Sequence, residues 1–234
     1  MQRIKNNISF VALIVTLIFL LSFSVSAANT PTLNQTINSG TLATDILDNN
    51  RSPVALPSVA FSAKTFSFDC QYGVNASTGV LGTNTQRLYV INPDAADGGW
   101  TLSLAATSGA AALWQNTGST QNYDFNDPTG TNPGCSDGAG ADVDNRPGQL
   151  TVNPSASSIV TDCQNCTDSN VTKGSSTGFD QIGAVDSVTL LNAAAGSDDI
   201  WRGYLTDVGL SQTIPAEQPA DSYSLQMTLT VGAN

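Results

Sequence analysis

The last stretch of the chain alternates strictly between apolar and polar side chains. In the run "YSLQMTLTV", which ends at Val231, every second residue is apolar and the residues between are Ser, Gln or Thr. A period of two is the pattern of a β-strand that buries one face. A helix would need a period near 3.6 residues, and almost no segment of this chain has one. The sequence therefore predicts an antiparallel β protein.

Shorter β-rich runs, separated by turn-forming residues, precede this strand. We expect them at 40–42, 59–70 (with Phe66, Phe68 and Cys70 on one face), 86–92, from Trp100, up to Pro154, from Asp186, and once or twice within 201–214. All but one of the 19 acidic residues are aspartates, which favour turns over helix surfaces. The pattern predicts a single all-β domain, an antiparallel β-sandwich or closed barrel of about 7–10 strands.

The N-terminus has the pattern of a secretory signal peptide. Arg3 and Lys5 precede an apolar run over 8–25, and the small residues Ser26 and Ala27 follow. We predict cleavage after Ala27, so that 1–27 is the signal peptide and 28–234 the exported domain. The alternative is that the apolar run is retained as a membrane anchor. Both interpretations place the rest of the chain outside the cytoplasm.

The charge and the missing histidine exclude several functions. The net charge is −11, and a surface of this sign repels phosphate backbones and anionic lipids. We therefore expect neither nucleic acid nor, once the signal peptide is cleaved, a membrane as partner. Without histidine, the chain has no Ser-His-Asp or Cys-His catalysis and no imidazole-bound metal.

The four cysteines, Cys70, Cys135, Cys163 and Cys166, are interpreted as two structural disulfides of an exported protein. The C-x-x-C pair also fits a redox site, but the neighbouring Asp162 and Asp168 disfavour a thiolate. A zinc site is a further alternative, although only one C-x-x-C pair is present. Of the three possible pairings we favour Cys70–Cys135 with Cys163–Cys166.

A long acidic loop over 117–148 interrupts the rhythm of strands. It is rich in Gly, Asn, Asp and Pro, and its carboxylates would repel one another unless something neutralises them. Calcium binds six to eight oxygens, so we predict a calcium site in this loop. The alternative is a solvated cluster of turns. The candidate ligands are Asp124, Asp127, Asp137, Asp142, Asp144 and Asn145.

No group of residues forms a recognisable catalytic site. Asp198 and Asp199 resemble a carboxylate pair, but adjacent residues of a strand point to opposite faces, which favours a turn. The surroundings of Lys173 in "TKGSSTG" are typical of a flexible loop rather than a Ser-Lys dyad. We therefore predict a protein that is not an enzyme.

The order of motifs resembles the WxL domain of bacterial surface proteins. The motif Trp100-Thr101-Leu102 follows two glycines, and a segment from Pro219 through Tyr223 leads into the final strand. The resemblance spans about residues 42–231, but the second Trp-x-Leu motif is replaced by Leu229-Thr230-Val231. It implies non-covalent attachment to the cell wall through peptidoglycan or another wall polymer, often beside other surface proteins. The residues implied are Trp100, Leu102, Tyr223, Leu229 and Val231.

The expected function is thus non-catalytic binding to the cell envelope by a protein of the extracellular surface or wall. The alternative is a structural subunit that assembles into a surface layer or fibre by strand addition at an exposed sheet edge.

Overall fold

The computed structural model describes residues 33–38, 40–93, 98–137, 146–166, 169–196 and 200–234. Residues 39–234 form one compact unit, and residues 1–38 form another. Within the unit over residues 1–38, the described residues 33–38 form no helix or strand, and Leu33 and Ile37 are exposed. The predicted signal peptide lies outside the described residues. In the part of the chain that is described, no helix has the length and apolarity needed to span a membrane.

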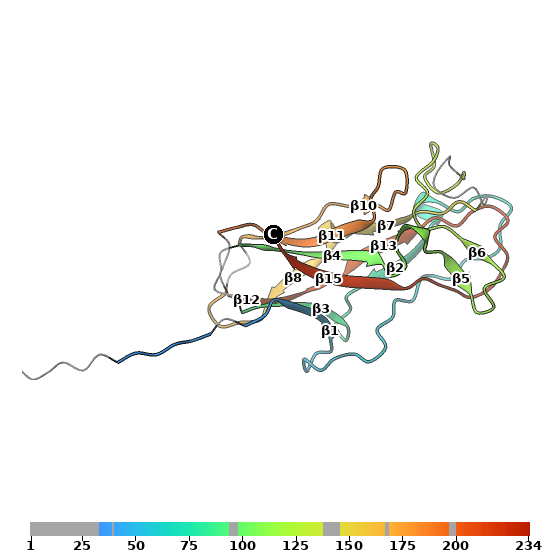
Figure 1. Ribbon diagram of the computed structural model, residues 1–234. Coiled ribbons are helices and arrows are strands. Elements are labelled where there is room, and N and C mark those ends of the chain that lie inside the picture. Colours follow the sequence, from blue (N-terminus) through green and yellow to red (C-terminus); the bar gives the residue numbers. More distant parts are fainter. Residues whose placement is uncertain (1–32, 39, 94–97, 138–145, 167–168, 197–199) are drawn as a thin grey trace, which may run out of the picture. The chain divides into compact units, whose positions relative to one another are not determined.

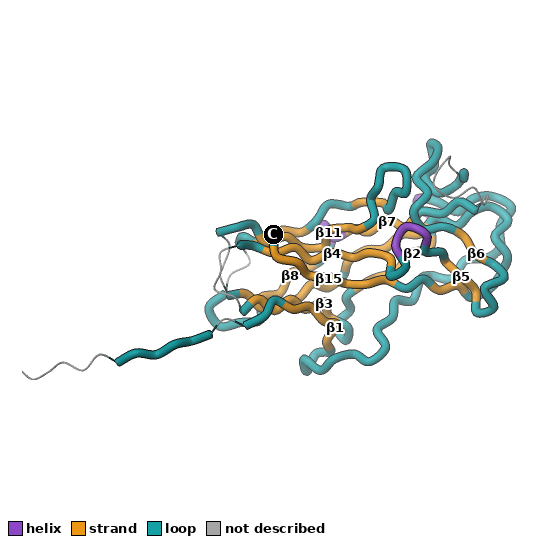
Figure 2. The backbone as a smooth tube through the Cα atoms, in the orientation of Figure 1, coloured by secondary structure: helices purple, strands orange, loops and turns teal. Residues whose placement is uncertain are grey.

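The all-β prediction is confirmed. The described residues contain 15 strands in four antiparallel sheets, and three single turns of 3₁₀ helix at Gly73–Asn75, Gly109–Ala111 and Pro154–Ala156 (Figure 2). The sheets keep open edges, so the arrangement is sandwich-like and the closed barrel is not found. The strands outnumber the prediction because several long strands are interrupted.

Two sheets continue one another as one layer (Figure 1). Three pairs of strands follow each other in the chain, β2 and β3, β7 and β8, and β12 and β13, and each pair passes from one sheet to the other. The break between β12 and β13 lies beside the end of β2, because the backbone N–H of Asp207 donates to the carbonyl of Gly82 at 2.7 Å. One sheet orders β1 (Ala43–Leu47), β3 (Arg87–Asn92), β12 (Trp201–Thr206) and β8 (Ser158–Thr161). The other orders β10 (Thr177–Gly178), β7 (Leu150–Asn153), β13 (Val208–Gln212) and β2 (Ser77–Leu81).

The final alternating run is confirmed in its pattern but not as one strand. Tyr223, Leu225, Met227, Leu229 and Val231 are partly buried, and the residues between them are exposed. The run divides because β14 (Tyr223–Ser224) pairs with β5 (Trp114–Asn116), whereas β15 (Met227–Ala233) pairs with β4 (Trp100–Ala106). Residues 225–226 pass between the two sheets. These sheets have the orders β15-β4-β11-β9, with β11 at Ser187–Ala193 and β9 at Val171–Lys173, and β14-β5-β6, with β6 at Asn122–Tyr123.

The core is centred on two tryptophans from different sheets. Trp100 of β4 and Trp201 of β12 are each 1% exposed, and their ring centroids lie 5.2 Å apart. The backbone conformation explains why a glycine, Gly99, directly precedes Trp100. Its φ is +73°, and a Cβ there would meet the carbonyl oxygen of Ala193 at 2.5 Å. Only glycine therefore admits the turn that starts this buried strand.

The run over 59–70 is not a strand, which corrects the prediction. It forms no continuous ladder: Ser62 donates to Thr78 at 2.7 Å, Glu217 donates to Ser67 at 2.9 Å, and a single bridge pairs Gln71 with Ile214. Phe66 and Phe68 are 45% and 75% exposed rather than buried. Alternation alone thus does not establish that a neighbouring strand is present.

Candidate functional site

Both favoured disulfides are present. Cys70 and Cys135 have Cα atoms 5.7 Å apart, and those of Cys163 and Cys166 lie 5.5 Å apart. The first bridge joins segments 65 residues apart and fixes the end of the irregular 59–70 run. Two disulfides fit an oxidising compartment.

The acidic loop is more ordered at its start than the sequence suggests. Trp114–Asn116 and Asn122–Tyr123 form a short hairpin, and Asp124, Phe125 and Asp127 are buried. Backbone bonds hold this part in place: Asp124 donates to Arg146 at 3.1 Å, and Asp127 donates to Gly148 at 2.9 Å. The prediction of a structureless loop is therefore wrong for residues 122–127, because Tyr123 and Phe125 reach the core.

The calcium site stays a prediction. Asp124 and Asp127 are buried and Asp137 is partly exposed, whereas Asp142, Asp144 and Asn145 lie outside the described residues. In the residues with a described placement, no three or more Asp, Glu, Cys or His side chains form a group able to hold a metal ion. Asp198 and Asp199 also fall outside the described part.

The residues implied by the Trp-x-Leu resemblance do not form one surface. Trp100 and Leu102 are 1% and 0% exposed, so both belong to the core. Leu102 pairs with Val231, and Leu104 pairs with Leu229, across β4 and β15. Tyr223 lies apart from them on β14. It lines a pocket.

That pocket, which we call the aromatic groove, has a volume of about 180 Å³. Its aromatic lining consists of Phe61, Phe66, Trp114, Tyr123 and Tyr223. Four of these rings form a continuous series: Phe61 meets Trp114 edge-on at 5.3 Å, Trp114 stacks on Tyr123 at 6.0 Å, and Tyr123 meets Tyr223 at 5.2 Å. In Figure 1, β5 and β6 lie at the end of the strands away from the C-terminus.

Hydrogen bonds fix two of these rings. The indole N–H of Trp114 donates to Oε1 of Gln212 at 2.8 Å, and Gln212 is 1% exposed in β13. The Tyr223 hydroxyl donates to the carbonyl of Pro219 at 2.7 Å and accepts from Nε2 of Gln218 at 2.8 Å. The groove is thus tied to the core through Gln212, and hydrogen bonds within the protein hold two of its rings in place.

Two charged side chains line the groove, the carboxylate of Asp221 and the ammonium group of Lys64. Oδ2 of Asp221 accepts from the side chain of Asn116, and Oδ1 accepts from the backbone of Ser222, both at 2.7 Å. The bond from Asn116, followed by that from Ser222, lowers the pKa of Asp221. Lys64 is exposed and forms no ion pair with any described residue. The charged groups of the groove therefore offset each other.

A short stretch of the chain with exposed apolar side chains begins at Phe66, which lines the groove. Phe66, Phe68, Tyr72 and Val74 are 45%, 75%, 43% and 100% exposed, and the rings of Phe66 and Phe68 meet edge-on at 5.1 Å. We call these four residues the apolar tip. They come from one short stretch that contains Cys70 of the long-range disulfide.

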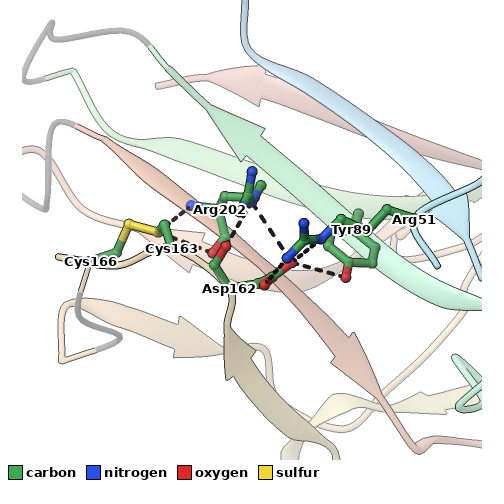
Figure 3. Close-up of polar contacts among 6 residues, drawn as sticks. All are labelled: Arg51, Tyr89, Asp162, Cys163, Cys166 and Arg202. Carbon is green, nitrogen blue, oxygen red and sulfur yellow. Dashed lines mark hydrogen bonds and ion pairs between the residues drawn. A yellow bond between two sulfur atoms is a disulfide. The ribbon is translucent and has the colours of Figure 1, made fainter. Parts of the chain in front are cut away.

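A second polar cluster surrounds Asp162 (Figure 3). Arg51 donates to both carboxylate oxygens, at 2.7 and 2.6 Å, and the buried Tyr89 donates its hydroxyl at 3.2 Å. Arg202 donates to the carbonyl of Asp162 at 2.7 Å. The pKa of Asp162 is lowered, mainly by the hydrogen bonds from Arg51. The hydrogen bond from Tyr89 and the positive charges of Arg51 and Arg202 lower it further, whereas partial burial raises it.

This cluster links distant parts of the chain. Arg51 follows β1, whereas Asp162 follows β8 and directly precedes Cys163 of the second disulfide. The Cys163 sulfur also accepts a hydrogen bond from the backbone N–H of Arg202 at 3.2 Å. Because its one carboxylate already accepts three hydrogen bonds from Arg51 and Tyr89, the cluster is best explained as a structural clasp.

Comparison of the chain with models of known protein families, with curated proteins and with solved structures found no match. The resemblance to the WxL domain therefore stays a prediction. The sequence patterns did not single out Trp114, Gln218 and Asp221 as site residues. The only local signal was the presence of aromatic residues in a polar region, "LWQN" and "NYDF".

Proposed function

We propose that the protein is exported and binds the cell envelope non-covalently, without catalysing a reaction. The observation that carries the proposal is the pair of exposed aromatic rings at the aromatic groove. Phe66 lines the groove and meets Phe68 edge-on at 5.1 Å, and the two side chains are 45% and 75% exposed. Exposed apolar side chains in contact with one another mark a binding surface more often than scattered ones do.

Three further features support this proposal. The two disulfides fit an exported protein. The groove is preformed by its own hydrogen bonds, as binding sites usually are. The net charge of −11 disfavours nucleic acid and anionic membranes as the partner, so a largely uncharged polymer of the envelope is favoured.

Sedimentation with purified cell walls tests the proposal. We expect the protein to pellet with the walls, and Phe68→Ser to reduce the pelleted fraction because it removes the most exposed ring of the tip. Ile182→Ser is the matched control, since Ile182 is 56% exposed outside both the tip and the groove. If wild-type protein stays in the supernatant, the proposal is wrong. If the wild type pellets but both variants pellet equally well, the apolar tip is not the binding surface.

A second candidate is a self-assembling structural subunit. Strand β15 lies at the edge of its sheet, and its one described partner is β4. An unpaired edge is a template for a strand from another molecule. The exposed Leu33 and Ile37 occupy a stretch without charged residues, which suits strand addition. Light scattering over a concentration series distinguishes the candidates: growth into large assemblies favours the subunit, and a constant monomer mass contradicts it.

A further inference from the structure

We propose that the aromatic groove receives one hexopyranose ring of an uncharged glycan chain. This inference rests on the proposed function, because it names the chemical class of the envelope polymer and the residues that contact it. The residues that contact the ligand are then Tyr223 and Asp221 of the groove, and not Trp100, which is buried.

The aromatic lining suits the apolar side of a sugar. A pyranose ring carries C–H groups on its faces and hydroxyls around its rim, so it needs an apolar surface below and polar groups at the side. Tyr223 and Phe66 supply ring surface that is partly or largely exposed, above the more deeply buried Trp114 and Tyr123. Pockets that combine an aromatic lining with a few placed polar groups are typical of small-molecule recognition.

The polar groups of the groove match hydroxyls. Asp221 stays ionised in mildly acidic conditions because its pKa is lowered, and each of its oxygens keeps a lone pair beyond the bonds from Asn116 and Ser222. Gln218 donates from Nε2 to the Tyr223 hydroxyl at 2.8 Å and to the Asn122 carbonyl at 3.5 Å, which leaves its amide oxygen as an acceptor. Lys64 adds a donor. Hydroxyls, which both donate and accept, satisfy this mixed set.

Size and charge narrow the ligand further. The volume of about 180 Å³ is below the roughly 300–1,000 Å³ of pockets that enclose drug-sized ligands. One ring therefore enters, while the rest of the chain extends past the groove over the apolar tip. Lys64 and Asp221 offset each other, and the protein around them is strongly negative. An anionic sugar would be repelled, whereas an uncharged sugar is not.

The groove is organised before the ligand arrives. Tyr223 is fixed by Gln218 and Pro219, and Trp114 is fixed by the buried Gln212. Little side-chain freedom is left to lose on binding, so a shallow site retains more of its contact energy as affinity.

Calorimetric titration with the β-1,4-linked trisaccharide of N-acetylglucosamine tests the proposal. We expect saturable binding to the folded protein. Asp221→Asn should weaken it about tenfold, since a hydrogen bond to a charged acceptor is worth more than one to a neutral amide. Asp186→Asn, the same change at an exposed carboxylate outside the groove, should leave the affinity unchanged. Because Asp221 is exposed, its variant should fold normally, which circular dichroism checks.

Absence of binding at millimolar trisaccharide, or equal affinity of both variants, would overturn this inference. The result is separable from that of the wall experiment. Protein that pellets with walls but ignores the trisaccharide overturns the assignment of the groove and keeps envelope binding. Protein that binds the trisaccharide through Asp221 but does not pellet with walls supports the groove and contradicts the proposed function.

Discussion

The two disulfides should differ strongly in their contribution to stability, because they close loops of very different length. Cys70 and Cys135 are separated by 65 residues, and Cys163 and Cys166 by 3. A cross-link stabilises the fold mainly by restricting the unfolded chain, and this effect rises with the logarithm of loop length. The relation gives about 4 kcal/mol for the long loop and about 1.5 kcal/mol for the short one.

Urea unfolding of two double variants measures this difference. Cys70→Ala with Cys135→Ala should lower the free energy of unfolding by about 2.5 kcal/mol more than Cys163→Ala with Cys166→Ala. Each variant removes one bridge and two sulfurs, so each controls for the other. Removal of the short bridge also removes the hydrogen bond from the Arg202 backbone N–H to the Cys163 sulfur, which makes the difference between the two variants slightly smaller. Equal losses, or a larger loss for the short bridge, would refute the loop-length reasoning.

Three further predictions concern the clasp, the floor of the groove and the acidic loop. Because the pKa of Asp162 is lowered in the folded state, its contribution to stability is present above about pH 3.9 and is lost as the pH falls through the pKa of the folded state. Asp162→Asn should therefore reduce the loss of unfolding free energy at acidic pH. Curves of unfolding free energy against pH that run parallel for the variant and the wild type would contradict the clasp. Gln212→Met leaves the Trp114 indole N–H and two backbone carbonyls without their partner and should cost about 2–4 kcal/mol in urea unfolding, so an unchanged midpoint would exclude a supporting role for Gln212. If calcium binds the acidic loop, chelator should lower the melting temperature, by the equivalent of about 2.7 kcal/mol when calcium had been present at a hundredfold excess over its Kd. The double variant Asp142→Asn with Asp144→Asn should not show this decrease. A melting temperature that changes with neither chelator nor calcium would contradict the calcium site and support the cluster of turns.

Local pattern was informative where a strand buries a full face. The alternation from Trp100 to Ala106 and from Tyr223 to Val231 appears in the structure as alternating burial, because each apolar side chain on one face packs on the same core. The pattern did not predict that β14 and β15 belong to different sheets. That division depends on β5, a strand of only 3 residues, which is too short to have a period.

Contacts between distant segments could not be read from the sequence. The run over 59–70 alternates like a strand, yet it lacks a neighbour that completes a ladder, so Phe68 is exposed. The pair of Arg51 and Asp162 joins residues 111 positions apart, and the cysteine next to Asp162 does not indicate an arginine as its partner. The groove arises in the same way, because Phe61, Trp114 and Tyr223 come from three separate regions and meet only in the fold.

Chemical-shift mapping tests most directly whether the aromatic groove is the envelope-binding site. Isotope-labelled protein would be titrated with soluble, uncharged glycan fragments released from purified cell walls. We predict saturable shifts in the backbone amides around Lys64, Trp114 and Asp221, and none around the clasp at Asp162. Shifts confined to the clasp, or no shifts at any fragment concentration, would contradict the assignment of the groove as the binding site.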